Sequence, residues 1–171
     1  MFFRVFNNRI SEDNFRLNEM RQRPFAVAKL RGSKEFENIS GEVNFFRSKD
    51  GIIVAVYVNN LPVKNENCKA NIFGFHLHEG DMCQDGEIPF NSAGDHFNPN
   101  SCPHPAHAGD FPPLFAGKTG YAQMTFWTDR LTENQVIGKT VLIHLNPDDL
   151  FSQPSGNSGK RIACGVVVEN N

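Results

Sequence analysis

Residues 43–58 read VNFFRSKDGIIVAVYV, and this stretch decides the fold class. Two runs rich in Val, Ile and Phe flank the segment Lys49-Asp50-Gly51, and runs of this length and composition are typical of β-strands. Asp-Gly favours a tight turn because it supplies the positive φ angles that such a turn needs. The stretch therefore predicts a β-hairpin, and an antiparallel sheet around it.

The other apolar segments of the chain are also short, and clusters of Gly, Pro, Asn and Asp separate them. The only helical signal is residues 132–135, Thr-Glu-Asn-Gln, which fit one capped turn. We expect an all-β protein with strands at residues 25–30, 41–46, 52–59, 70–78, 121–127, 139–144 and 162–168.

Composition narrows the class of protein. A chain of 171 residues that is 39% hydrophobic has room for one domain with a full core. A net charge of -2 gives no reason to expect nucleic acid or an anionic membrane as a partner. The longest apolar stretches, such as residues 52–58, have the length of a strand and not of a membrane span. We therefore predict neither a nucleic-acid nor a membrane partner.

The first 24 residues are rich in Arg, Glu and Asp and lack the apolar run of a secretory signal. We interpret residues 1–24 as an N-terminal extension that precedes a domain at residues 25–171. The missing signal predicts a cytoplasmic protein. A periplasmic or secreted protein is the alternative if a leader has been removed.

Two segments do not fit the strand pattern. Residues 80–114 and 146–160 are dense in Gly, Pro, Asn, Asp and Ser, and both are too long for turns. Long loops in compact domains are usually functional. The sequence therefore predicts a β scaffold whose chemistry lies on two large loops.

The histidines give the first indication of that chemistry. His76 and His78 are separated by one residue in a predicted strand, so both imidazoles lie on the same face. Two nitrogen donors on one face favour a metal site. Taken alone, this pattern is also compatible with two surface histidines.

A second cluster lies on the first long loop, where His96, His104, His107 and Asp110 follow one another among several prolines. Three nitrogens and one oxygen suit tetrahedral zinc, although the alternative is a polar loop with exposed histidines. His144 ends an apolar run, where a histidine is more often a hydrogen-bonded core residue. All six histidines of the chain are nevertheless used if two adjacent metal sites are present.

Three motifs then resemble one known family. GFHLHE at residues 74–79, GDHFNP at 94–99 and GKRIACGV at 159–166 are similar to the copper-zinc superoxide dismutases and occur in the family's order. The resemblance spans roughly residues 26–168. It implies a Greek-key antiparallel β-sandwich or flattened barrel of about eight strands. The two long loops would be the family's zinc loop and electrostatic loop.

The resemblance implies two cofactors, copper and zinc, with one shared ligand. His96 would bridge the metals, and Asp148 would accept hydrogen bonds from one copper and one zinc histidine. A solvated turn is the alternative for Asp148. The implied ligands are His76, His78, His96 and His144 for copper, and His96, His104, His107 and Asp110 for zinc.

The implied activity converts two superoxide anions into dioxygen and hydrogen peroxide by cycling between Cu(II) and Cu(I). Arg161 would guide the anion with a guanidinium that is always charged, and His96 would return a proton to the nascent peroxide. For Arg161 the alternative is an ordinary surface arginine. Two other functions stay open, a non-catalytic copper- and zinc-binding protein of the same fold and a zinc-only structural relative. A homodimer and a monomer are both compatible with the sequence.

The four cysteines allow three pairings in principle, and the residues alone do not choose among them. The resemblance implies a disulfide between Cys83 and Cys164. Cys68 and Cys102 do not match family positions, and for these two we favour the reduced state over a second disulfide.

The sequence also departs from parts of the family. The segment after His144, residues 145–160, is shorter than in the eukaryotic members, whereas the early Cys83 and residues 109–112 look more like the bacterial members. Asp95, directly before His96, replaces a residue that is usually small or neutral. Its negative charge lies near the predicted copper approach, so we expect it to oppose the capture of superoxide.

Overall fold

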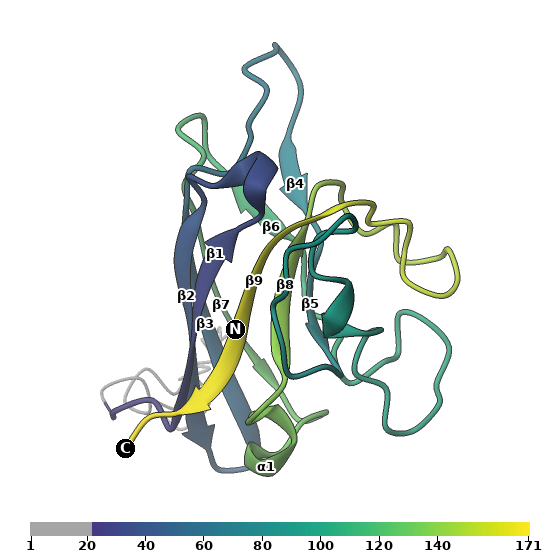
Figure 1. Ribbon diagram of the computed structural model, residues 1–171. Coiled ribbons are helices and arrows are strands. Elements are labelled where there is room, and N and C mark those ends of the chain that lie inside the picture. Colours follow the sequence, from purple (N-terminus) through teal and green to yellow (C-terminus); the bar gives the residue numbers. More distant parts are fainter. Residues whose placement is uncertain (1–21) are drawn as a thin grey trace, which may run out of the picture.

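The computed structural model describes residues 22–171, and within them nine strands form one antiparallel sheet. The sheet order is β4-β6-β7-β3-β2-β1-β9-β8-β5, so the two edge strands, β4 and β5, follow each other in the sequence with only Gly74 between them. The sheet therefore curls into a nearly closed, flattened barrel (Figure 1). The elements are β1 (Ala26–Gly32), β2 (Ser40–Ser48), β3 (Gly51–Asn59), β4 (Asn71–Phe73), β5 (Phe75–His78), β6 (Leu114–Ala116), β7 (Ala122–Thr128), α1 (Glu133–Val136), β8 (Thr140–His144) and β9 (Arg161–Glu169), with single 3-10 turns at Lys34–Phe36 and Asn91–Ala93.

The predicted hairpin is confirmed, because β2 and β3 pair along their whole length and Ser48 lies opposite Gly51. The positive φ angles expected for Asp50 and Gly51 in this turn are not observed, so that part of the prediction was wrong. Gly51 does not have a positive φ angle, and neither do the two turn residues. A Cβ atom at Gly51 would lie 2.3 Å from the carbonyl oxygen of Thr128 on β7, so the glycine is needed for close packing between strands.

The predicted strand at residues 70–78 is in fact two strands. At Gly74 the chain leaves its neighbour β6 and joins β8, where the N–H of His144 donates to the Gly74 carbonyl at 2.8 Å. A Cβ atom on Gly74 would lie 2.9 Å from the side chain of Ser158. The short strand β6 was not expected: Leu114 is the last residue of the predicted loop 80–114, and Phe115 and Ala116 lie between that loop and the next predicted strand.

Side chains that alternate between the two faces of the central strands form the core. Val43 and Phe45 of β2 and Val54 and Val56 of β3 point inward and are completely buried. The predicted helical turn is also confirmed: α1 begins with a capping box in which the Thr132 N–H donates to the Gln135 side chain.

Both long loops extend from the side of the barrel that β5 and β8 form (Figure 1). These two strands pair from Phe75 opposite Ile143 to His78 opposite Thr140. The barrel thus presents the histidines of β5 and the last residue of β8, His144, beneath the two loops.

The predicted N-terminal extension is residues 1–24, of which residues 1–21 lie outside the described part of the chain. From there the chain leads into β1, and the Pro24 carbonyl accepts a hydrogen bond from Asn170 at 2.9 Å. Of the helices in the described part of the chain, none has the length and apolar character needed to cross a membrane.

Candidate metal centre

Two groups of ligand atoms converge beneath the loops. His76, His78, His96 and His144 bring one ring nitrogen each to within 4.8 Å of one another. His96, His104, His107 and Asp110 form a second group with the same spacing. All seven side chains are buried, and His96 belongs to both groups. The residues that the sequence suggested for two metal sites are therefore brought together as two adjacent clusters.

Hydrogen bonds on the outer nitrogens fix the direction of the rings in the first cluster. His78 Nδ1 lies 3.0 Å from the Gly94 carbonyl, and His144 Nδ1 lies 3.2 Å from the Gly159 carbonyl. Their Nε2 atoms consequently face each other at 3.2 Å. A carbonyl can only accept, so each Nδ1 carries the proton and each Nε2 offers a lone pair.

The second cluster forms around one carboxylate. Asp110 Oδ1 lies 2.7 Å from His96 Nδ1, and Oδ2 lies 3.1 Å from His104 Nδ1 and 3.3 Å from His107 Nδ1. The main-chain N–H of His107 donates to Oδ2 at 3.0 Å and so closes the loop on the carboxylate. Three nitrogens and one oxygen thus face a common point.

Four buried ring nitrogens in the described residues have no hydrogen-bond partner, namely Nδ1 of His76, Nε2 of His96, and Nδ1 of both His104 and His107. Buried polar atoms without partners are rare because losing water without compensation costs free energy. All four atoms point into the two clusters. A metal ion bound to them would satisfy each one, so the donor sets fit metals, four nitrogens suiting copper and three nitrogens with one oxygen suiting zinc.

Asp148 lies between the two clusters. Its Oδ2 accepts from His76 Nε2 at 2.7 Å, and its Oδ1 accepts from His104 Nε2 at 2.9 Å. Burial raises the pKa of this carboxyl, but the hydrogen bonds from His76, the Leu150 amide and His104 outweigh burial and hold the pKa well below its usual range. Asp148 is therefore a carboxylate that orients one histidine of each cluster.

Three imidazoles of the first cluster, those of His76, His78 and His144, are neutral at neutral pH. Burial lowers the pKa of His76 to about 4, even though Asp148 raises it in part. Burial and the neighbouring His76 lower the pKa of His144 to about 3. Burial likewise brings the pKa of His78 well below its ordinary value. At neutral pH these rings keep the lone pairs that metal binding requires.

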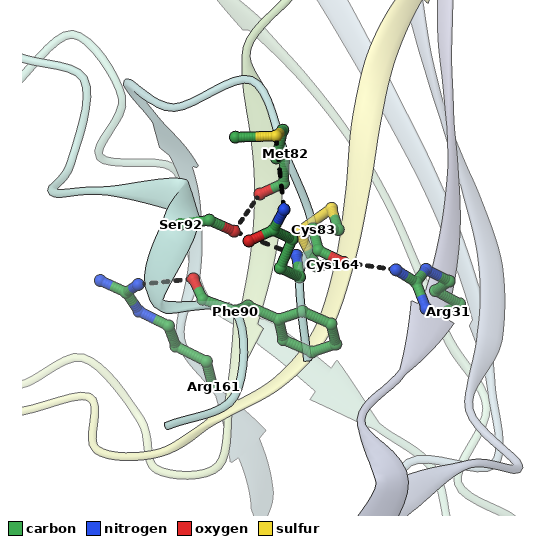
Figure 2. Close-up of a disulfide and its surroundings, with 8 residues drawn as sticks. Arg31, Met82, Cys83, Phe90, Ser92, Arg161 and Cys164 are labelled. Carbon is green, nitrogen blue, oxygen red and sulfur yellow. Dashed lines mark hydrogen bonds between the residues drawn. A yellow bond between two sulfur atoms is a disulfide. The ribbon is translucent and has the colours of Figure 1, made fainter. Parts of the chain in front are cut away.

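Arg161 begins β9 beside the first cluster. Its guanidinium donates to the Phe90 carbonyl at 2.8 Å (Figure 2) and to the Gly94 carbonyl at 2.6 Å. The Gly94 carbonyl also accepts from His78, so Arg161 and a histidine of the cluster share one anchor. Burial lowers the pKa of Arg161, which Asp95 partly reverses, and a guanidinium remains charged.

An open pocket of about 370 Å³ reaches the first cluster. His78, His96, His144 and Arg161 line it, and Asp95 lies at the same wall. A small anion entering this pocket meets the guanidinium and the histidines together. The pocket also brings the exposed carboxylate of Asp95 close to that path, as the sequence suggested.

The disulfide between Cys83 and Cys164 is confirmed, and it ties the first long loop to β9 three residues after Arg161 (Figure 2). The Cys83 carbonyl accepts a hydrogen bond from Arg31 of β1. Cys68 and Cys102 are free, as favoured from the sequence.

Two supporting residues were missed by sequence reasoning. Gln153 on the second loop accepts from the His104 N–H at 3.0 Å and donates to the His104 carbonyl at 2.7 Å. Gly156 has a φ angle of +65°, and a Cβ atom there would lie 1.9 Å from Asp148 Oδ1. A glycine in a loop is a weak indication of a positive φ angle, so Gly156 could have been noticed in the sequence. Gln153 offered none.

The comparisons with known proteins agree with this geometry. The family model of the copper/zinc superoxide dismutases matches residues 39–167. The chain belongs to this family. Membership gives copper and zinc as its cofactors, and the two histidine clusters are compatible with both.

Three of the relatives with curated names are bacterial copper-zinc superoxide dismutases. The Deinococcus radiodurans protein is 34% identical over 146 residues, which cover 75% of this chain and 76% of the relative. Two Aquifex aeolicus proteins are 31% and 33% identical over 156 and 141 residues, covering 81% and 74% of this chain and 86% and 79% of the relatives. The predicted closeness to the bacterial members is confirmed.

Proposed function

We propose that this protein is a superoxide dismutase, in which the first cluster holds copper and the second holds zinc. It takes two superoxide anions and two protons and releases one dioxygen and one hydrogen peroxide. Bound copper supplies the one-electron exchange by alternating between Cu(II) and Cu(I). The observation that carries this proposal is His96, which turns one ring nitrogen to each cluster.

The remaining contribution comes from the chain itself. Arg161 lies in the open pocket with its guanidinium fixed by two carbonyls, so it can attract superoxide without moving. His96 is the candidate proton donor. Its Nδ1 is held by Asp110, which leaves Nε2 as the atom that can carry a proton toward peroxide.

Asp148 and the carbonyls of Gly94 and Gly159 hold four of the other rings at their outer nitrogens, those of His76, His78, His104 and His144. Such partners fix the tautomer and orientation of a ligand histidine. The rings therefore do not have to reorganise when the metals bind.

The test is to load the metal-free protein with copper and zinc and to measure both metals by element and superoxide consumption on the same sample. We expect one copper-dependent activity that increases with copper occupancy. Bound copper without activity would leave a non-catalytic copper- and zinc-binding protein as the function. Zinc at both sites without copper uptake would favour the zinc-only relative.

The oligomeric state and the cellular location stay predictions. Sedimentation of the metal-loaded protein distinguishes a homodimer from a monomer. Fractionation of the source cells tests the predicted cytoplasmic location against a periplasmic or secreted one.

A further inference from the structure

Arg130 lies on the connection between β7 and α1, outside both long loops. The three hydrogen bonds of its guanidinium all go to main-chain carbonyls of the first long loop. Nη1 donates to His107 at 3.0 Å and to Pro105 at 3.4 Å, and Nη2 donates to Asp110. Two of these three carbonyls belong to residues of the second cluster.

We propose that Arg130 is a positioning residue for the zinc site. A guanidinium is planar and holds its N–H groups in a rigid fork, so carbonyls that share it are fixed relative to one another. Here the fork fixes the backbone of His107 and Asp110. Their side chains are those that face the zinc cluster, and this inference rests on the proposed function for the identity of that metal.

The turn from His107 to Asp110 shows why such a clamp matters. The Asp110 N–H donates to the His107 carbonyl at 3.2 Å, and the His107 N–H donates to Asp110 Oδ2 at 3.0 Å. These contacts hold the turn together internally but do not attach it to the rest of the molecule. Arg130 supplies an attachment to the β7–α1 connection, on the same turn that carries two ligands.

Two other attachments hold this part of the loop, but at different main-chain atoms from those that Arg130 holds. The Leu77 N–H donates to Gly109 at 2.9 Å, which joins the turn to β5, and Gln153 holds the main chain of His104. Neither contact reaches the carbonyls of His107 and Asp110. Loss of Arg130 therefore removes this attachment from the peptide planes that follow His107 and Asp110 while the barrel stays intact.

The experiment compares Arg130→Gln and Arg130→Lys with the control Arg47→Gln. Arg47 lies near the same end of the molecule, where it pairs with Glu133 at 2.9 Å, and within residues 22–171 no hydrogen bond or ion pair is seen between its side chain and the two long loops. Zinc and copper affinities of each metal-free protein are measured by competition with a chromophoric chelator. Co²⁺ absorption reports the geometry of the zinc site, and thermal unfolding of the metal-free proteins reports stability.

We expect Arg130→Gln to weaken zinc binding by about 10- to 100-fold, the usual range when a residue that orients metal ligands is lost. Copper affinity stays within about threefold. The Co²⁺ bands lose intensity, whereas Arg47→Gln keeps both the affinity and the bands. Arg130→Lys recovers only part of the zinc affinity, because an ammonium does not reproduce the planar fork.

Unchanged zinc affinity in Arg130→Gln would overturn the proposal, and so would equal losses of zinc and copper affinity. If Arg130→Gln does not fold, Arg130→Lys decides, since a zinc affinity equal to that of the unmodified protein shows that the fork is not needed. Failure of the proposed function has a different signature. It appears in the unmodified protein as absent zinc binding, or as full metal loading without superoxide consumption.

Discussion

At the scale of single residues, Arg161 has the clearest role to test. Arg161→Ala removes the fixed positive charge from the pocket but leaves every ligand side chain in place. We expect both metals to remain bound and the rate of superoxide consumption to fall by about tenfold or more, as when electrostatic guidance of association is lost. Stopped-flow kinetics measures the rate of superoxide consumption, and elemental analysis of the same sample measures the bound metals. Unchanged kinetics would remove Arg161 from the mechanism.

Asp95 lies at the same pocket with the opposite charge. Asp95→Asn should raise the rate of capture about twofold at low salt, because a unit charge roughly 8 Å from the anion's path repels it by about 0.5 kcal/mol in water. The gain should shrink as ionic strength rises. Glu169→Gln makes the same charge change at the far end of β9 and serves as the control. A similar gain in both variants would assign the effect to net charge alone.

At the scale of elements, the second long loop depends on Gly156. A Cβ atom in Gly156→Ala would overlap Asp148 Oδ1, and it would also lie 2.7 Å from His104 Nε2. We expect Asp148 to be displaced from His76 and His104, with affinity for both metals falling by about tenfold or more.

Gly138→Ala provides a matched control for that variant. Gly138 also has a positive φ angle, +79°, but a Cβ atom there meets nothing within 4 Å. Both alanines carry the same backbone strain, of about 1 kcal/mol. Only Gly156→Ala should lose metal in the competition assay, and an equal loss in Gly138→Ala would mean that strain, not the contact with Asp148, is the cause.

The disulfide joins the first long loop to β9 across 81 residues of sequence. On the loop-entropy model a closed loop of this length stabilises the fold by about 4 to 5 kcal/mol. The double variant Cys83→Ala with Cys164→Ala should lose stability of this order in urea unfolding of the metal-free protein. Cys68→Ser changes an exposed free cysteine and should leave the unfolding midpoint unchanged. A double variant as stable as the parent would contradict the model.

At the scale of the whole molecule, the buried histidines make the stability of the metal-free protein depend on pH. The pKa of His76 is lowered to about 4 and that of His144 to about 3, against 6.5 in an unfolded chain. The folded state therefore binds fewer protons below pH 6.5. Stability is complete above that pH and is lost as the pH falls toward 4.

We expect each of these two histidines to remove roughly 2 kcal/mol from the free energy of unfolding between pH 7.5 and 4.5. The carboxylates of Asp110 and Asp148 have lowered pKa values, so their contribution is lost only below the ordinary carboxyl range. Urea unfolding of the metal-free protein across this interval measures the loss. A flat profile would show that these histidines are not buried as neutral rings.

Sequence patterns correctly predicted the features of the fold that are determined by residues close together in the sequence. The hairpin at residues 43–58 and the histidine pair of β5 follow from alternation and spacing, and the family motifs supplied the ligand sets. The break at Gly74 was missed although a glycine inside a strand is a weak signal of irregularity, because the change of partner depends on β6 and β8, which are distant in the sequence. Gln153 and Arg130 were missed for a similar reason, since both act on main-chain atoms of a distant loop and such contacts leave no pattern in the sequence.

The outer edge of β5 has a further consequence. In the sheet order β5 is an edge strand, and the segment that carries the zinc ligands pairs with it through bridges from His76 to Asp110 and from His78 to His96. An uncovered strand edge offers N–H and C=O groups on which another chain can add. The zinc loop therefore also shields the barrel from self-association. If this loop detaches, the strand that carries two of the histidines becomes a template for aggregation.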